Sequence, residues 1–250
     1  MRALILSSFV AGDAIGGGAQ QLALAGLGWQ AALVPTVVFG RSPAKGGRGR
    51  ATDPDHFAAM LEDVAAEGWL GADLVVTGHF SHPGQVEAAA EALRRAPPRV
   101  LVVDPVLGDA PKGLYVRPEV ATALEALLLP LADWVTPNAW ELSHLAGLEV
   151  GDVAAARHAA RQLEPPALVT SVPLGETEIG LLCCRQGAAT LIAHPRLPQA
   201  PNGVGDLVAA VFGASLAQGR QAADAAADAA RAVLERLMPS AGTLRIEPLS

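Results

Sequence analysis

The chain has 250 residues, 51% of them hydrophobic, so it is long enough to bury a sizeable core in one large domain or two small ones. Charged residues make up only 17%, which argues against a disordered chain. The formal net charge of −7 gives no basic footprint for nucleic acid, although an acidic protein can still bind an anion through backbone amides at a helix start.

The N-terminal residues, the apolar runs and the cysteines indicate the cellular compartment in which the protein is expected. The N-terminal apolar run stops at Ser7, which favours a buried first strand over a signal peptide. No apolar run approaches the ~20 residues needed to span a bilayer, so no membrane association is expected. Cys183 and Cys184 are adjacent, and strand neighbours point to opposite faces, so a reducing, cytoplasmic compartment is the simplest interpretation.

Short apolar runs alternate with amphipathic, alanine-rich stretches along the chain. Strands are expected at residues 3–6, 31–38, 74–77, 100–103, 134–135, 167–171, 179–184 and 190–193, the last two as a hairpin. Helices are expected at residues 18–27, 56–67, 85–95, 120–129, 140–146, 153–163, 207–217 and 222–237. With no clear linker, this pattern predicts a single α/β domain over residues 1–250 whose sheet carries helices on both faces.

One connection stands apart. Residues 40–53 are rich in Gly, Arg, Lys, Ser and Pro and are too long and polar for a tight turn. They are interpreted as a flap over a site or as an ordinary surface loop.

Polar residues and glycines gather just after the predicted strands, where α/β sheets bind their ligands. In chain order they are Ser7, Ser8 and residues 12–18, Thr36, Gly78, His79, Asp104, Asp109, Thr136, Asn138, Glu141, Thr170 and Ser171.

The Gly-Val-Gly-Asp sequence at residues 203–206 is the strongest of these elements. Gly203 and Gly205 let the backbone turn tightly around Val204 with its amides pointing one way, and the following helix adds a positive dipole end. Such a cradle suits a transferring phosphoryl group, with Asp206 placed to take a proton from an attacking hydroxyl. The plainer alternative is a tight turn with Asp206 as a helix N-cap.

Three carboxylates, Asp104, Asp109 and Glu141, lie near strand ends without a matching excess of Lys or Arg. Hard oxygen ligands of this kind suit Mg²⁺ held partly through water and phosphate oxygens. Asn138 shares a helix face with Glu141. Separate turn and cap roles are the alternative for each residue.

Several common motifs are missing. The glycines at residues 16–18 match neither a Walker phosphate loop nor the dinucleotide fingerprint. The six histidines form no metal-ligand pair, and no Gly-x-Ser-x-Gly elbow supports a hydrolase.

The ordered set of motifs from about residue 3 to 217 resembles the pyridoxal kinases of the ribokinase-like superfamily. The similar segments are residues 8–12, 36–39, 77–78, 104–109, 112–116, 136–142, 170–171 and 203–206. Each segment alone is weak, and their order makes the resemblance specific.

The resemblance implies a three-layer α/β/α fold with a mostly parallel sheet, no separate lid domain and a homodimer. It implies ATP and Mg²⁺ as cofactors, with a monovalent cation such as K⁺ as a possible addition. By matching position, Ser8 and Thr36 would contact a pyridine ring, with His79 and Asp13 on the same side. The nucleotide side would comprise Asp104, Asp109, Tyr115, Asn138, Thr170 and Ser171, with Asp104 and Glu141 near the metal. Gly203, Val204 and Gly205 would form the anion hole, and Asp206 would be the general base.

The departures fall on the substrate side. Phe9 stands where the family usually has His, His79 where it often has Tyr, and the 40–53 segment lacks the usual pattern. Residues 13–21 instead resemble the first loop of hydroxymethylpyrimidine kinases, which commonly carry Cys where this chain has Asp206.

The sequence therefore predicts an ATP-dependent kinase of the 5′-hydroxymethyl group of pyridoxal or related B6 vitamers. A hydroxymethylpyrimidine or small-sugar kinase of the same fold is the first alternative. A catalytically silent ligand-binding homologue is the second.

Overall fold

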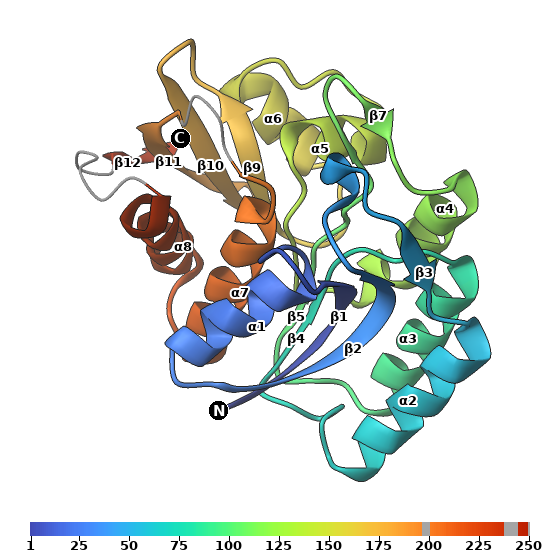
Figure 1. The fold of residues 1–250 in the computed structure, drawn as a ribbon. Coiled ribbons are helices and arrows are strands. Elements are labelled where there is room, and N and C mark those ends of the chain that lie inside the picture. Colours follow the sequence, from blue (N-terminus) through green and yellow to red (C-terminus); the bar gives the residue numbers. More distant parts are fainter. Residues whose placement is uncertain (197–200, 238–244, 250) are drawn as a thin grey trace.

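The computed structural model describes residues 1–196, 201–237 and 245–249, and its core is a ten-stranded sheet (Figure 1). The strands lie in the order β12-β11-β10-β9-β8-β5-β4-β1-β2-β3. Their bounds are β1 Arg2–Val10, β2 Gln30–Phe39, β3 Gly49–Ala51, β4 Leu74–Thr77, β5 Leu101–Val103, β8 Trp134–Val135, β9 Ala167–Pro173, β10 Glu178–Arg185, β11 Ala188–Pro195 and β12 Arg245–Leu249. A separate ribbon pairs β6 Gly108–Asp109 with β7 Gly113–Leu114.

The middle of the sheet is parallel, as predicted. Strands β2, β1, β4, β5, β8 and β9 run parallel, and β3, β10, β11 and β12 add antiparallel pairs at the two edges. Every residue of β4 and β5 is buried, which explains why both read as unbroken apolar runs.

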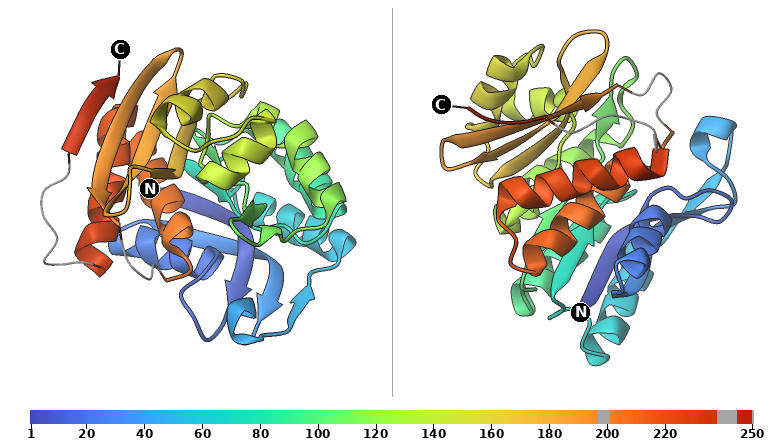
Figure 2. Two further views of the ribbon diagram at one scale, coloured as in Figure 1. Left: turned by 90° about the horizontal axis from the view of Figure 1, so that it is seen from above. Right: turned by 90° about the vertical axis from the view of Figure 1, so that its left-hand side faces the viewer.

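Helices cover both faces of the sheet (Figure 2). One face carries α1 Gly17–Gly26, α7 Val204–Ala217 and α8 Ala222–Leu237. The other carries α2 Pro54–Ala66, α3 Pro83–Arg95, α4 Pro118–Leu127, α5 Ala139–Ala146 and α6 Val153–Ala160. Short 3₁₀ turns occur at Pro43–Lys45 and Leu129–Leu131. Successive side chains of β1 point to opposite faces of the sheet, so the hydrophobic core has two parts. Ala3 and Ile5 pack towards α7, whereas Leu4 and Leu6 pack towards α3.

Helix α7 runs close against the sheet. Nearly all of its residues from Leu207 to Ala217 are buried, and a Cβ on Gly213 would lie 2.8 Å from Leu74 and 3.1 Å from Val102. This close approach fixes the start of α7 beside the loops at the carboxyl edge of the sheet. No helix in the described part of the chain is long and apolar enough to cross a membrane.

The predicted boundaries needed correction where polar residues continue a strand. Strand β1 extends to Val10 and β9 to Pro173, so Ser7 and Ser8 lie within a strand rather than after it. Thr36, Thr170 and Ser171 lie within β2 and β9, inside the ranges expected for those strands. Backbone ladder hydrogen bonds do not depend on side-chain polarity, and the apolar runs understated the strands for that reason. Helix α7 begins at Val204 with Gly203 as its N-cap, so the alternative that made Asp206 the N-cap is wrong.

The segment at residues 40–53 is tied to the loop after β1. Amides of Ala11 and Gly12 donate to the carbonyls of Phe39 and Gly40, at 2.9 and 3.1 Å. Asp13 accepts a hydrogen bond from the Ser42 amide and pairs with Lys45. The segment therefore packs beside the β1–α1 loop, and β3 adds to the sheet edge.

Candidate active site

Asp206 lies in the first turn of α7 and is half-buried. Its Oδ2 accepts a hydrogen bond of 2.8 Å from the Gly16 amide, in the loop between β1 and α1. Burial raises the pKa of Asp206, and the Gly16 hydrogen bond offsets part of that rise. The carboxyl is thus held in place by a residue 190 positions earlier in the chain.

Two glycines make this contact possible. Gly16 has φ +62° and Gly203 has φ +93°, conformations that residues with a Cβ rarely adopt. A Cβ on Gly203 would lie 2.6 Å from the Ala14 carbonyl oxygen, so the turn before α7 packs directly on the β1–α1 loop. The role of Gly16 was missed from the sequence, since its spacing matched no phosphate-binding motif.

The start of α7 has the properties of an anion site. Amides in the first turn of a helix have no intrahelical acceptor, and the Leu207 amide is the first to bond back, to the Gly203 carbonyl at 3.1 Å. The amides of Val204 and Gly205, together with the helix dipole, therefore favour a negatively charged group beside Asp206.

Glu141 is buried and held by three backbone amides. Its Oε1 accepts from Leu107 at 2.8 Å and Gly108 at 3.4 Å, and its Oε2 accepts from Asn138 at 2.9 Å. Asn138 caps α5 in return, through a 2.9 Å bond to the Glu141 amide, and donates to the Gly108 carbonyl. Burial raises the pKa of Glu141 to about 7, although these hydrogen bonds oppose the rise.

Asp104 completes a group of acids around the start of α7. It directly follows β5, is only 6% exposed, and has a pKa well above its ordinary value. Burial is the main cause, followed by repulsion from Glu141 and then Asp206, while the Thr136 hydroxyl opposes the shift. Asp104, Glu141 and Asp206 therefore lie close enough to influence one another.

Tyr115 faces the same acids from the β6–β7 side. Burial raises its pKa, and Glu141, Asp109, Asp104 and Asp206 add to the rise in that order. The ring is half-exposed, so it lies at the rim of the acidic group. Asp109 is exposed in β6.

Within the described residues, no three His, Cys, Asp or Glu side chains are arranged to hold a metal ion by themselves. The oxygens of Glu141 are largely engaged by backbone amides, so a cation there would need further ligands from phosphate oxygens and water. A divalent cation still fits this place chemically, because Asp104 and Glu141 repel each other when both are charged. Their assignment as metal ligands stays a prediction.

The residues predicted for the substrate side fall into separate positions. Ser8 is nearly buried beside Gly16, where a Cβ on Gly16 would overlap its hydroxyl, and so it lies near Asp206. Thr36 is fully buried and donates to the His79 carbonyl at 2.5 Å, so its hydroxyl is already engaged. The Asp13 carboxyl is likewise engaged, by Ser42 and Lys45.

Burial lowers the pKa of His79 to about 4, so its ring is neutral at pH 7. Its Nε2 lies 3.4 Å from the Ser81 hydroxyl.

The residues predicted for the nucleotide side meet next to α5. The Thr170 amide donates to the Pro137 carbonyl at 2.8 Å, and Thr170 forms an isolated bridge with Asn138. Ser171 is exposed with φ +58°, a strained value for a residue with a Cβ. These contacts place Thr170 beside the acidic group.

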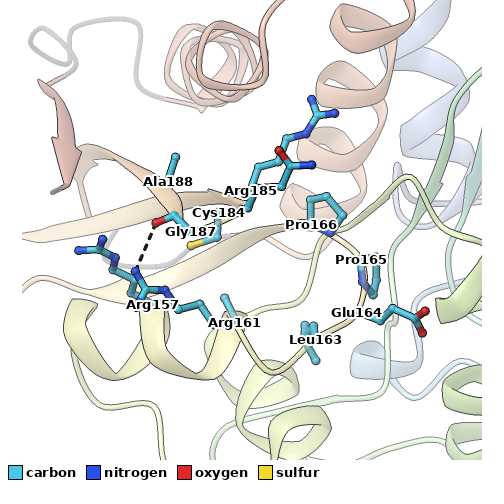
Figure 3. Close-up of a pocket in the computed structure, with 12 residues that line it drawn as sticks. Arg157, Arg161, Leu163, Glu164, Pro165, Pro166, Cys184, Arg185, Gly187 and Ala188 are labelled. Carbon is cyan, nitrogen blue, oxygen red and sulfur yellow. Dashed lines mark hydrogen bonds between the residues drawn. The ribbon is translucent and has the colours of Figure 1, made fainter.

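A pocket of about 280 Å³ lies elsewhere, at the amino end of β9 (Figure 3). It is lined by Arg157 of α6, by Arg161 directly after that helix, and by Cys184 of the β10–β11 hairpin. Arg161 donates to the Gly187 carbonyl at 3.3 Å. Burial raises the pKa of Cys184 to about 11, so this thiol is not activated. The pocket is distinct from the acidic group, which follows the carboxyl ends of β5 and β8.

Comparisons with known proteins bear on this arrangement. The sequence matches the family model described as phosphomethylpyrimidine kinase over residues 18–245. It is 34% identical over 227 residues to the pyridoxine/pyridoxal/pyridoxamine kinase of Bordetella bronchiseptica, covering 85% of this chain and 80% of that protein.

Solved structures are similar over almost the whole chain. The pyridoxal kinase of Entamoeba histolytica superimposes with a TM-score of 0.90 at 24% identity, covering 99% of both chains. The pyridoxal kinase of Staphylococcus aureus, solved with AMP-PCP and with pyridoxal, gives TM-scores of 0.87 and 0.86 at 18% identity, over 99% of this chain and 98% of that one. These likenesses confirm the predicted three-layer, mostly parallel fold.

Proposed function

The chain belongs to the phosphomethylpyrimidine kinase family, in its pyridoxal kinase branch, and we propose that it transfers the γ-phosphoryl group of ATP to the 5′-hydroxymethyl group of pyridoxal or a related B6 vitamer. The observation that carries the proposal is the anchored carboxyl of Asp206 at the start of α7, with Asp104 and Glu141 beside it. The sequence relatives named for acting on pyridoxal and the solved AMP-PCP complex support the same chemistry.

In this mechanism Asp206 accepts the proton of the hydroxymethyl group. The hydroxyl oxygen forms a bond to the γ-phosphorus, and the bond from that phosphorus to the bridging oxygen of ADP breaks. Amides of Gly203, Val204 and Gly205 stabilise the charge on the transferring phosphoryl group. The Gly16 amide keeps the Asp206 carboxyl in position.

Asp104 and Glu141 would hold Mg²⁺ jointly with phosphate oxygens and water. When bound, the ion would neutralise charge that develops on the phosphates. The exposed hydroxyl of Ser171 and the rim position of Tyr115 would serve the nucleotide, and Ser8 would serve the acceptor.

Replacing the base tests the proposal directly. We expect Asp206→Asn to lower kcat by about 10²–10⁴-fold while ATP binding, measured by calorimetry, is largely retained. Asp224→Asn is the matched control, since Asp224 also lies in the first turn of a helix, α8, where it is exposed. Near-full turnover by Asp206→Asn would exclude it as the base.

A second substrate has specific support. The family model carries the phosphomethylpyrimidine kinase description, and residues 13–21 resemble the first loop of such enzymes. Turnover of pyridoxal, pyridoxine, 4-amino-5-hydroxymethyl-2-methylpyrimidine and a small sugar with Mg-ATP separates the candidates. Turnover of the pyrimidine without any of pyridoxal would reverse the ranking, and tight binding with no ATP consumption would identify a silent homologue.

The homodimer, the cytoplasmic location and a K⁺ requirement stay predictions. Leu22 on α1, Leu27 directly after it and Val38 on β2 are exposed apolar side chains, of the kind that a subunit interface would cover. The two cysteines are unpaired, which suits a reducing compartment.

A further inference from the structure

A row of polar positions crosses the carboxyl edge of the sheet beneath the start of α7. The pairing of Leu6 with Thr77, Thr77 with Val103, and Val103 with Val135 sets the register. The next residue of each chain segment is Ser7, Gly78, Asp104 or Thr136, in adjacent positions. Strand alternation puts all four on the α1–α7 face, because Ile5, Val76, Val102 and Trp134 pack in that core cluster.

Three side chains in this region are buried without a hydrogen-bond partner among the described residues. They are the hydroxyls of Ser7 and Thr136 and both amide atoms of Gln20, on α1. The Thr136 hydroxyl lies close enough to Asp104 to lower its pKa, but it forms no hydrogen bond of ordinary geometry. Ser7 and Gln20 have no exposed surface, and Thr136 is 3% exposed. Folded proteins rarely leave such groups unsatisfied, because each loses its hydration without compensation.

Two of these side chains, those of Ser7 and Gln20, meet at Gly78. A Cβ built on Gly78 would overlap the Ser7 hydroxyl and lie 3.6 Å from Gln20 Nε2, so both side chains reach the place that Gly78 leaves free. Gln20 follows Gly16 by one helical turn, and the Gln20 backbone amide donates to the Gly16 carbonyl at 3.1 Å. Thr136 borders the same row on the far side of Asp104. Because residue 78 is glycine, the Ser7 hydroxyl can lie over it, with the Gln20 side chain next to it.

We propose that Ser7, Gln20 and Thr136 bind internal water beneath the acidic group, and that this water layer is what positions Asp104. A buried water makes two to four hydrogen bonds. The Ser7 hydroxyl, the Gln20 amide and the Asp104 carboxyl supply partners on one side of Asp104, and the Thr136 hydroxyl supplies one on the other side. Ser7, Gln20 and Thr136 act through water rather than on substrate, so they are positioning residues.

Replacing Gln20 by an apolar residue raises or lowers the stability of the protein, depending on whether water is bound to the Gln20 side-chain amide. An apolar side chain of similar length stabilises the protein if the Gln20 amide has no partner, and destabilises it if water is bound there. We expect Gln20→Met to lower Tm by several degrees in calorimetry of the full chain. Gln21→Met is the matched control, since Gln21 is the next residue of α1 and donates instead to the Ala31 carbonyl at 2.9 Å.

A crystal structure at a resolution that defines ordered water gives the second test. Density within hydrogen-bond distance of the Ser7 hydroxyl and the Gln20 amide is expected in the wild-type protein and lost in Gln20→Met. A raised Tm for Gln20→Met, or side chains bonded to the protein with no water between them, would overturn the proposal.

The positioning role rests on the proposed kinase function and has its own readout. Ser7→Ala is expected to lower kcat about tenfold while the KM for ATP stays within twofold, whereas a purely structural role would lower Tm and leave kcat unchanged. If the wild-type protein turned over no substrate, the proposed function would fail, and the melting and crystallographic results would still decide the water site.

Discussion

Burial after β4 holds the pKa of His79 near 4, well below that of an exposed imidazole. As the pH falls from about 6.5 to about 4, the unfolded chain takes up this proton and the folded protein does not. The residue therefore costs stability as the pH falls through that window, by on the order of 3 kcal/mol when the window is complete. Above pH 7 it costs nothing, because the ring is neutral in both states.

The His79→Asn variant should remove this dependence. We expect the difference in unfolding free energy between variant and wild type to shift in favour of the variant as the pH falls from 7 to 4. Denaturant titrations at several pH values measure it. Exposed His56 in α2 supplies the control for replacing a histidine, and His56→Asn is measured in the same titrations. A pH-independent difference for His79→Asn would contradict the buried, neutral state of this ring.

Among the secondary-structure elements, the start of α7 contains two glycines, Gly203 and Gly205, that have different roles. Gly203 has φ +93° and packs on Ala14, whereas Gly205 is exposed and a Cβ there would meet no atom within 4 Å. The first glycine therefore serves the fold, and the second leaves room for a ligand in front of the helix amides.

Alanine at each glycine should separate these tasks. We expect Gly203→Ala to destabilise the protein by about 1–3 kcal/mol, through strain at positive φ and contact with the Ala14 carbonyl. Gly219→Ala, with φ +85° and open space around it, should lose only the strain contribution. Gly205→Ala should keep its Tm and lower kcat/KM for ATP at least tenfold. Unchanged kinetics for Gly205→Ala would mean that no phosphoryl group approaches the α7 amides.

The predictable elements were those whose side chains carry the pattern. The apolar runs of β4, β5 and β8 located those strands within one residue, and the Gln186-Gly187 turn located the β10–β11 hairpin. The strands β3, β6, β7 and β12 were not predicted, because none of them contains an unbroken apolar run of the kind that marks β4, β5 and β8. Tertiary pairing, rather than local preference, forms such pieces.

The site was predictable to the extent that it follows strand ends. Asp104, Glu141 and Asp206 were placed together because parallel strands share one carboxyl edge. The sequence could not show that the Gly16 amide would meet Asp206 across 190 residues, or that Thr36 would use its hydroxyl on His79. Both depend on the register of neighbouring segments, which side-chain type does not specify.

For the molecule as a whole, the acidic group is a concentration of negative charge in a chain that already has a net charge of −7. Asp104 has a raised pKa because its charged form is disfavoured by burial and by Glu141 and Asp206. Such a carboxyl adds stability below its unfolded pKa, and that contribution is lost as the pH rises through its folded value. The ligand-free protein therefore gives up stability at neutral and alkaline pH in order to keep a place for a cation and phosphates.

Replacing this carboxyl should reveal the exchange between stability and binding. We expect Asp104→Asn to raise Tm without ligands at pH 8 by several degrees, and by less at pH 5, because the raised pKa lets the wild-type carboxyl take up a proton more readily at the lower pH. The same variant should lose most of the increase in Tm that saturating Mg-ATP gives the wild type, since ligand stabilisation grows with binding to the folded state.

Thermal melts of the full chain with and without Mg-ATP provide the measurement. Asp224→Asn is the control, because Asp224 is exposed in the first turn of α8 and its replacement should leave the ligand-free Tm nearly unchanged. A lower ligand-free Tm for Asp104→Asn at pH 8 would show that its carboxylate is stabilised in the folded protein. The acids would then form a structural network and not a site kept ready for a charged ligand.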